Sequence, residues 1–195
     1  MWLTRKLGIE NLYAVQTLAS AKIADALNRH RAAEHEPLRV FIQLNTSGEQ
    51  SKGGIDISSS LSTSSPSSPP SIAAAKGAEE ELAQLATHVI RACPRLRLVG
   101  LMTIGRPGGG EEDFVALREA RDRLVRVLPD HDDVWGEDVG GADTHGRGRG
   151  LLLSMGMSHD FELALGAGAD VVRVGTGIFG ARPPKKGDAA PAEQP

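Results

Sequence analysis

The chain has 195 residues, of which 40% are apolar, so it can form one domain with a substantial core or most of a larger one. Its net charge is −3 and its basic residues are dispersed, which argues against a nucleic-acid-binding surface. No apolar run approaches the roughly 20 residues of a membrane span, and Cys93 as the single cysteine excludes an internal disulfide. These features predict a cytoplasmic protein with no nucleic-acid or membrane partner; a mitochondrial location stays open.

Two internal stretches lack the pattern of packed structure. Residues 58–71 are almost entirely serine and proline and predict a disordered insertion. Residues 129–150 are rich in glycine and aspartate and predict a mobile surface loop, and a disordered tail is expected over 183–195. The loop holds side chains that can bind divalent metals, namely His131, Asp132, Asp133, Asp143 and His145. Their spacing matches no ligand pattern, so a solvated loop is favoured over a metal site.

The remaining segments alternate between strand and helix patterns. In chain order, we expect a strand over 11–18, a helix over 20–35, a strand over 38–45, a helix over 78–94, a strand over 96–105, a helix over 111–128, a strand over 151–158, a helix over 159–168 and a strand over 171–180. Ser20 is the expected N-cap of the first helix. Such alternation implies an α/β fold with parallel strands joined by crossover helices.

Small and polar residues follow the last two predicted strands, at the edge where parallel α/β folds bind ligands. Ser158 is placed to cap the helix that begins at His159, and Gly156 would let the backbone approach a ligand closely. Gly175 and Thr176 would add amides and a hydroxyl from the neighbouring strand. The pattern favours an anion site over the alternative in which the glycines are turn residues and Ser158 is only a cap.

Arg173 lies in the last predicted strand and alternates with Val172 and Val174. Burying a guanidinium without a partner is too costly, so it needs an anion or another acceptor. A ligand phosphate, carboxylate or aromatic nitrogen would serve. The alternative is a structural ion pair with an acid such as Asp160 or Asp170.

Four motif-bearing segments resemble, in order, the pyridoxal phosphate homeostasis proteins, also called the YggS or PROSC family. They are residues 11–28, 44–55 (LNTSGEQSKGGI), 98–105 (LVGLMTIG) and 153–182, which includes SMGMS and VRVGTG. That family is similar in fold to the N-terminal barrel domain of alanine racemase. The resemblance implies a TIM-barrel protein that binds pyridoxal 5′-phosphate (PLP), has no established enzymatic reaction and keeps the free cofactor in check.

The resemblance also implies which residues hold the cofactor. The SMGMS motif places five residues near the phosphate, namely Ser154, Met155, Gly156, Met157 and Ser158. The second motif adds Gly175 and Thr176 on the same group. Arg173 corresponds to the family's arginine near the pyridine ring or the phosphate, and both positions stay open. Beside the ring nitrogen it would keep that nitrogen unprotonated, which suits storage better than amino-acid chemistry.

The chain departs from the family at its start. The family holds PLP as a Schiff base on a lysine of the first barrel strand, and motifs like those of its first three strands are missing here. Residues 1–182 are therefore expected to form a partial barrel of about five of the eight βα units, with exposed strand edges. All lysines lie outside the predicted strands. Lys52 is the candidate to replace the family's Schiff-base lysine. We favour the alternatives that it is a hydrated loop lysine or that it has another role in the motif.

Together these patterns predict a PLP-binding protein of intracellular vitamin B6 homeostasis that retains the phosphate site and is not an enzyme. No catalytic residue or metal ligand is assigned. One alternative is part of a PLP-dependent racemase-like or decarboxylase-like enzyme completed by another chain, and another is a truncated interaction protein without the cofactor. The implied partners are PLP and apo-forms of PLP-dependent enzymes, and a complete barrel would be a monomer.

Overall fold

The computed structural model describes most of the regions in which regular structure was expected. The described residues are 12–49, 52–58, 72–106, 108, 110–128 and 150–180, with side chains from residue 76 onward in the third of these ranges. The predicted serine- and proline-rich insertion beyond Ser58 lies outside them. So do the loop over 129–149, with its histidines and aspartates, and the tail over 183–195.

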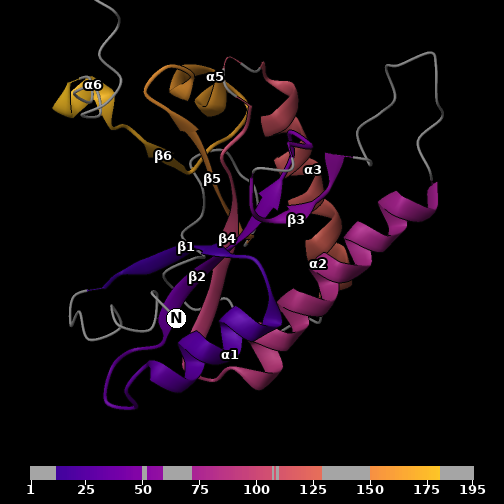
Figure 1. Ribbon diagram of the computed structural model, residues 1–195, viewed down its shortest axis with the longest axis vertical. Coiled ribbons are helices and arrows are strands. Elements are labelled where there is room, and N and C mark those ends of the chain that lie inside the picture. The colour runs from indigo at the N-terminus through magenta and orange to yellow at the C-terminus, as the bar shows by residue number, and fades with distance from the viewer. Residues whose placement is uncertain are drawn as a thin grey trace, which may run out of the picture.

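The described part is built on a parallel sheet with the strand order β1-β2-β4-β5-β6 (Figure 1). These strands are β1 (Ala14–Leu18), β2 (Leu38–Asn45), β4 (Leu96–Thr103), β5 (Leu152–Met157) and β6 (Val171–Arg173). A two-residue strand that was not predicted, β3 (Ile55–Asp56), pairs with the end of β2. Spatial order follows chain order, and the sheet curls into a half-barrel, so the prediction of a partial TIM-type barrel is confirmed.

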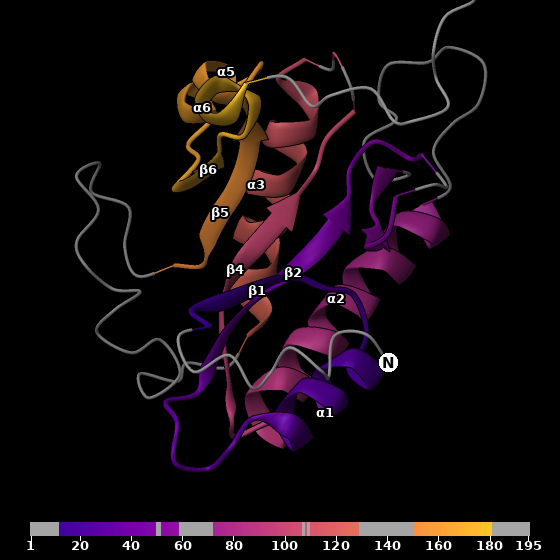
Figure 2. The same cartoon turned by 60° about the vertical axis from the view of Figure 1, so that its left-hand side comes forward.

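Helices α1 (Ala21–His30), α2 (Ile72–Ala92) and α3 (Glu112–Val127) cover the same face of the sheet (Figure 2). Ser20 caps α1 as predicted, because its Oγ accepts a hydrogen bond from the Ile23 amide at 3.4 Å. Helix α2 begins at Ile72 rather than at residue 78, since the alanines that precede the apolar stripe are themselves strong helix formers. No helix in the described part of the chain has the length and apolar character of a membrane span.

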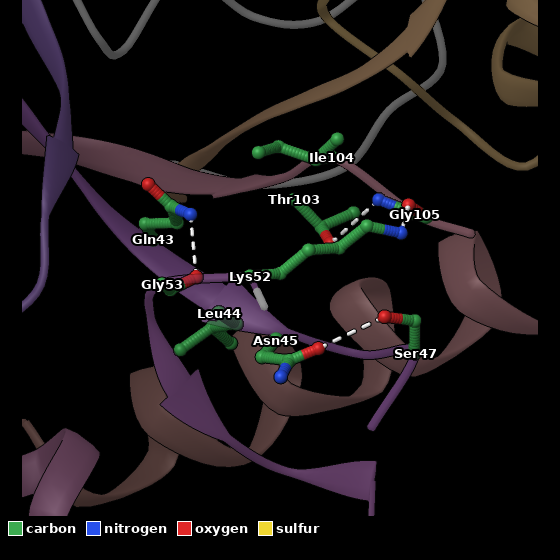
Figure 3. A pocket seen from close by; sticks show the side chains of 9 residues that line it. All are labelled: Gln43, Leu44, Asn45, Ser47, Lys52, Gly53, Thr103, Ile104 and Gly105. Carbon is green, nitrogen blue, oxygen red and sulfur yellow. Dashed lines mark hydrogen bonds between the residues drawn. The ribbon is translucent and has the colours of Figure 1, made fainter. Parts of the chain in front are cut away.

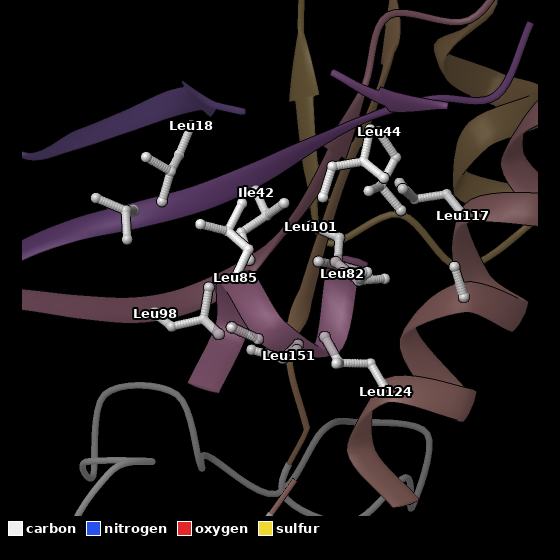
Figure 4. Packing of buried hydrophobic residues seen from close by; sticks show 14 of the residues in the cluster. Leu18, Ile42, Leu44, Leu82, Leu85, Leu98, Leu101, Leu117, Leu124 and Leu151 are labelled. Atoms are coloured by element: carbon white, nitrogen blue, oxygen red, sulfur yellow. The ribbon is translucent and has the colours of Figure 1, made fainter. Parts of the chain in front are cut away.

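The main core lies between these helices and the sheet (Figure 4). Alternate strand residues such as Ile42, Leu101 and Leu153 point into it and are fully buried. The opposite, concave face of the sheet carries a smaller cluster around Phe41 and Met102. Strands with apolar residues on both faces are typical of parallel sheets, which explains the nearly continuous apolar runs in the sequence.

The prediction of a strand over 171–180 is correct for the first three residues and wrong for the rest. Strand β6 ends at Arg173, and the chain turns at Gly175 into the short helix α6 (Thr176–Phe179). Ile178 and Phe179 resemble a continuing strand in the sequence, because a run this short does not distinguish a strand from a helical turn. The helix predicted over 159–168 is also shorter, and α5 spans Phe161–Gly166.

Candidate functional site

The concave face of the half-barrel becomes polar toward the carboxyl ends of the strands. Nearer the amino ends of the strands, this face is lined by apolar residues, namely Ala14, Phe41, Leu152 and Val171. Two residues further along each strand, on the same face, lie Gln16, Gln43, Ser154 and Arg173. This arrangement places hydrogen-bonding groups at the edge where parallel α/β barrels bind their ligands.

Arg173 is the centre of a network on this face. Its Nη1 donates to Ser154 Oγ at 2.8 Å, and its Nη2 donates to the Thr103 carbonyl at 2.7 Å. Ser154 Oγ donates in turn to Gln16 Oε1 at 2.8 Å. Because β2 and β4 separate β1 from β5 in the sheet, this last contact reaches across the curved face. The sequence placed Ser154 and Arg173 at one site but missed Gln16 and Thr103, for which only the alternation along each strand was a signal.

The charge of Arg173 has no carboxylate partner within ion-pair distance in the described part of the chain. The side chain is half-buried, and this desolvation lowers the pKa of its guanidinium, while the more distant charge of Asp160 opposes the shift. Asp160 accepts from the Met157 amide at 2.6 Å, and Asp170 accepts from the Leu153 amide at 2.8 Å. Among the described residues, the alternative of a structural ion pair with either acid is therefore wrong, and the positive charge faces neutral acceptors.

Ser158 contacts the first turn of α6 and does not cap the helix that follows it in sequence. Its Oγ accepts hydrogen bonds from the amides of Gly175, at 3.0 Å, and Gly177, at 3.2 Å. The expected cap on α5 is wrong, because that helix begins only at Phe161 and Asp160 occupies its N-cap position. The structure thus brings the predicted residues Ser158 and Gly175 together through a hydrogen bond between two strand ends.

The other predicted residues lie around this contact with different exposures. Gly156 has φ +89°, and a Cβ there would lie 2.6 Å from the Cβ of Ala164, so the glycine allows α5 to pack closely on β5. Met155 is fully buried in the core, which leaves only its backbone for a ligand. Met157 is half-buried, and Thr176 is exposed at the start of α6.

Lys52 lies beside a narrow recess between the ends of β2 and β4 (Figure 3). Its Nζ donates to Glu49 Oε1 at 2.7 Å and to the Gly105 carbonyl at 2.6 Å, and its side chain is only 15% exposed. Nearby, Gln43 Nε2 donates to the Gly53 carbonyl at 2.5 Å. Lys52 therefore joins the loops that follow two strands. Of the two roles that the sequence favoured, this contact excludes a freely hydrated loop lysine and agrees with another role in the motif.

We expect Lys52→Met to lower the free energy of unfolding by about 1–2 kcal/mol, because two charge-assisted hydrogen bonds are lost and the Gly105 carbonyl loses a donor. The denaturant midpoint measures the effect. Lys22→Met, at an exposed position on α1, is the matched control and should change the midpoint little. Equal midpoints for the two variants would show that Lys52 does not hold the loops together.

Comparison with known proteins gives curated relatives and solved structures, and no family model matches the chain. Over 183 residues it is 35% identical to the pyridoxal phosphate homeostasis protein of Schizosaccharomyces pombe, covering 91% of this chain and 60% of the relative. The corresponding protein of Haemophilus influenzae is 36% identical over 181 residues, with the same shares covered. PipY of Synechococcus elongatus, solved with PLP bound, superposes with a TM-score of 0.58 at 20% identity, covering 91% of this chain and 66% of PipY.

A parallel sheet curled into a half-barrel, with helices outside and polar groups at the carboxyl ends of its strands, defines a partial TIM-type barrel. The superposition on PipY supports the same fold. Over 91% of its length, the chain is homologous to pyridoxal phosphate homeostasis proteins. It spans 60% of the length of the two curated relatives described above.

Proposed function

We propose that this chain binds PLP non-covalently at the polar end of the concave face, chiefly through the phosphate, and serves in vitamin B6 homeostasis. The observation that carries the proposal is Arg173, a half-buried cation whose hydrogen-bond partners in the described part of the chain are all neutral. A dianionic phosphate or the anionic oxygen of the pyridine ring would supply the charge that the site lacks. The names of the relatives and the PLP in the structure of PipY point to the same ligand.

The phosphate fits the groups around Ser158. The serine hydroxyl uses its acceptor capacity on the amides of Gly175 and Gly177, which leaves its hydrogen available to a phosphate oxygen. Thr176 adds a second exposed hydroxyl. Apart from the residues next to Gly175 in the chain, no atom of the described residues lies within 4 Å of the position that a Cβ would take there, which leaves room for a ligand. We therefore propose Ser154 to Ser158, Gly175 and Thr176 as the phosphate-binding segment.

Non-covalent binding follows from where the lysines lie. The described strands contain no lysine, and the amine of Lys52 is engaged by Glu49 and Gly105. A Schiff base at Lys52 would require both hydrogen bonds to break and the amine to lose its proton. We propose that this chain holds PLP as the free aldehyde and that, as in the resembled family, no reaction follows.

Binding through the phosphate is tested by comparing three ligands. PLP titration should show saturable binding that inorganic phosphate competes away, while pyridoxal should bind at least about tenfold more weakly, because it lacks the group that the amides and hydroxyls recognise. Fluorescence quenching or calorimetry gives the affinities. Equal binding of PLP and pyridoxal would contradict the phosphate assignment.

A second measurement separates non-covalent binding from an imine. Borohydride reduction of the PLP complex should leave the mass of the protein unchanged at stoichiometric PLP, because no imine is present to reduce. The Lys52→Met variant is the control, and it should give the same result. An adduct on the unmodified chain that disappears in Lys52→Met would establish Lys52 as the covalent anchor and contradict the proposal.

A further inference from the structure

Three side chains with metal-binding atoms converge on the helical layer, away from the strand ends. Asp25 lies on α1, His88 lies on α2, and Cys93 follows directly after α2. Asp25 Oδ1 is 2.7 Å from His88 Nε2 and 3.9 Å from Cys93 Sγ, and the three ligand atoms all lie within 4.8 Å of one another. None of the three takes part in the PLP site proposed above.

We propose that Asp25, His88 and Cys93 form a binding site for a divalent transition-metal ion, with zinc(II) as the ion of best fit. A thiolate, an imidazole nitrogen and a carboxylate oxygen are the ligand types that zinc takes in proteins. With metal–ligand bonds of about 2.0–2.3 Å, tetrahedral geometry separates the ligand atoms by roughly 3.3–3.6 Å. The third pair of ligand atoms, His88 Nε2 and Cys93 Sγ, lies within 4.8 Å, so side-chain rotations must bring the three atoms to equal distances around the ion.

The backbone around the site is well anchored. Cys93 is fully buried, and its amide donates to the Val89 carbonyl at 3.3 Å while its own carbonyl accepts from the Leu96 amide at 2.9 Å. This fixes the thiol at the end of α2. The side chains of His88 and Asp25 are 31% and 51% exposed, so the fourth coordination position would open to solvent and take a water molecule.

Without a metal, hydrogen bonds hold the same three side chains together. Asp25 Oδ1 lies within hydrogen-bond distance of His88 Nε2, at 2.7 Å, and of the Cys93 thiol, at 3.9 Å. A bound cation would replace the thiol proton and the imidazole–carboxylate hydrogen bond with bonds to one centre. The ion would then clamp α1 to α2 and stabilise the folded chain.

Cobalt(II) is a sensitive probe, because its bond to a thiolate gives a charge-transfer absorbance in the near ultraviolet. Cys93 is the only cysteine of the chain, so this band can arise only from Cys93. Titration of the full chain should give the band at one equivalent of cobalt, and added zinc should remove it. Zinc should also raise the melting temperature in a concentration-dependent way.

Variants identify the ligands. Cys93→Ala should abolish the band, and both His88→Gln and Asp25→Asn should weaken cobalt binding at least about tenfold. His30→Gln, an exposed position on α1, is the matched control and should bind cobalt as the unmodified chain does. If Cys93→Ala does not fold, the half-exposed His88→Gln gives the same information, with circular dichroism reporting its fold.

Two results would overturn the proposal. One is the absence of a thiolate band together with no effect of zinc on melting, which would make the cluster a structural contact between α1 and α2 even if its variants are less stable. The other is zinc binding that survives in Cys93→Ala and His88→Gln but disappears in His131→Gln or His145→Gln. Those two histidines lie outside the described residues, and that result would place the metal there.

Discussion

Arg173→Ala should weaken PLP binding by about 1.5–3 kcal/mol, which corresponds to roughly 10- to 150-fold in affinity, while changing the free energy of unfolding by no more than about 1 kcal/mol. The affinity falls because the ligand loses a charged hydrogen-bond donor. The stability changes little because two effects oppose each other. The variant loses the hydrogen bonds of Arg173 to the Ser154 hydroxyl and the Thr103 carbonyl, but it also no longer has to desolvate the guanidinium. Ser154 keeps its hydrogen bond to Gln16.

Denaturant midpoint and PLP affinity should be measured on the same Arg173→Ala sample. Arg173→Lys retains the charge but not the forked donor geometry, so an intermediate affinity is expected. Arg29→Ala, at an exposed position on α1, is the control for loss of a positive charge elsewhere. A loss of about 3–5 kcal/mol in stability without a specific loss of affinity would instead indicate that Arg173 has a structural role and does not serve the ligand.

Gly100→Ala should lower the free energy of unfolding by about 3 kcal/mol or more, the largest stability effect that we expect. Gly100 lies in the middle of β4 and pairs with Leu152 of β5. A Cβ at this position would overlap the Leu152 carbonyl oxygen and come within 2.6 Å of the Phe41 ring. The carbonyl belongs to the neighbouring strand, so it can move only if the pairing of β4 with β5 is disturbed.

Gly77→Ala on α2 is the matched control, because among the described residues no atom outside its own stretch of helix lies within 4 Å of its added Cβ. At an exposed helical position, this change should raise the free energy of unfolding by about 0.4–1 kcal/mol. Both variants are compared by urea denaturation and circular dichroism. A Gly100→Ala variant as stable as the unmodified chain would show that the sheet and the Phe41 ring adjust easily, which would contradict the close packing of β4 on β5.

The sequence by itself determined the elements whose signals are local. The five main strands have apolar runs bounded by turn residues, helices α1 and α3 have apolar faces at helical spacing, and Ser20 caps the helix that directly follows it. The order of these elements predicted the parallel sheet and the partial barrel. Alternation along the last strand predicted that Arg173 faces away from Val172, and Arg173 lies on the concave face, where Val171 also packs. Each of these features depends on residues within a few positions of one another.

Tertiary structure decided where one segment meets another. Strand β6 is followed by α6 from Gly175 onward. There the hydroxyl of Ser158, which follows β5, accepts hydrogen bonds from the amides of Gly175 and Gly177. Gln16 reaches Ser154 because the sheet curves, and no pattern within β1 or β5 encodes the degree of that curvature. Asp25 meets His88 and Cys93 only where α1 packs on α2. Propensity and periodicity act over one or two turns of chain, whereas these contacts join residues that packing alone brings together.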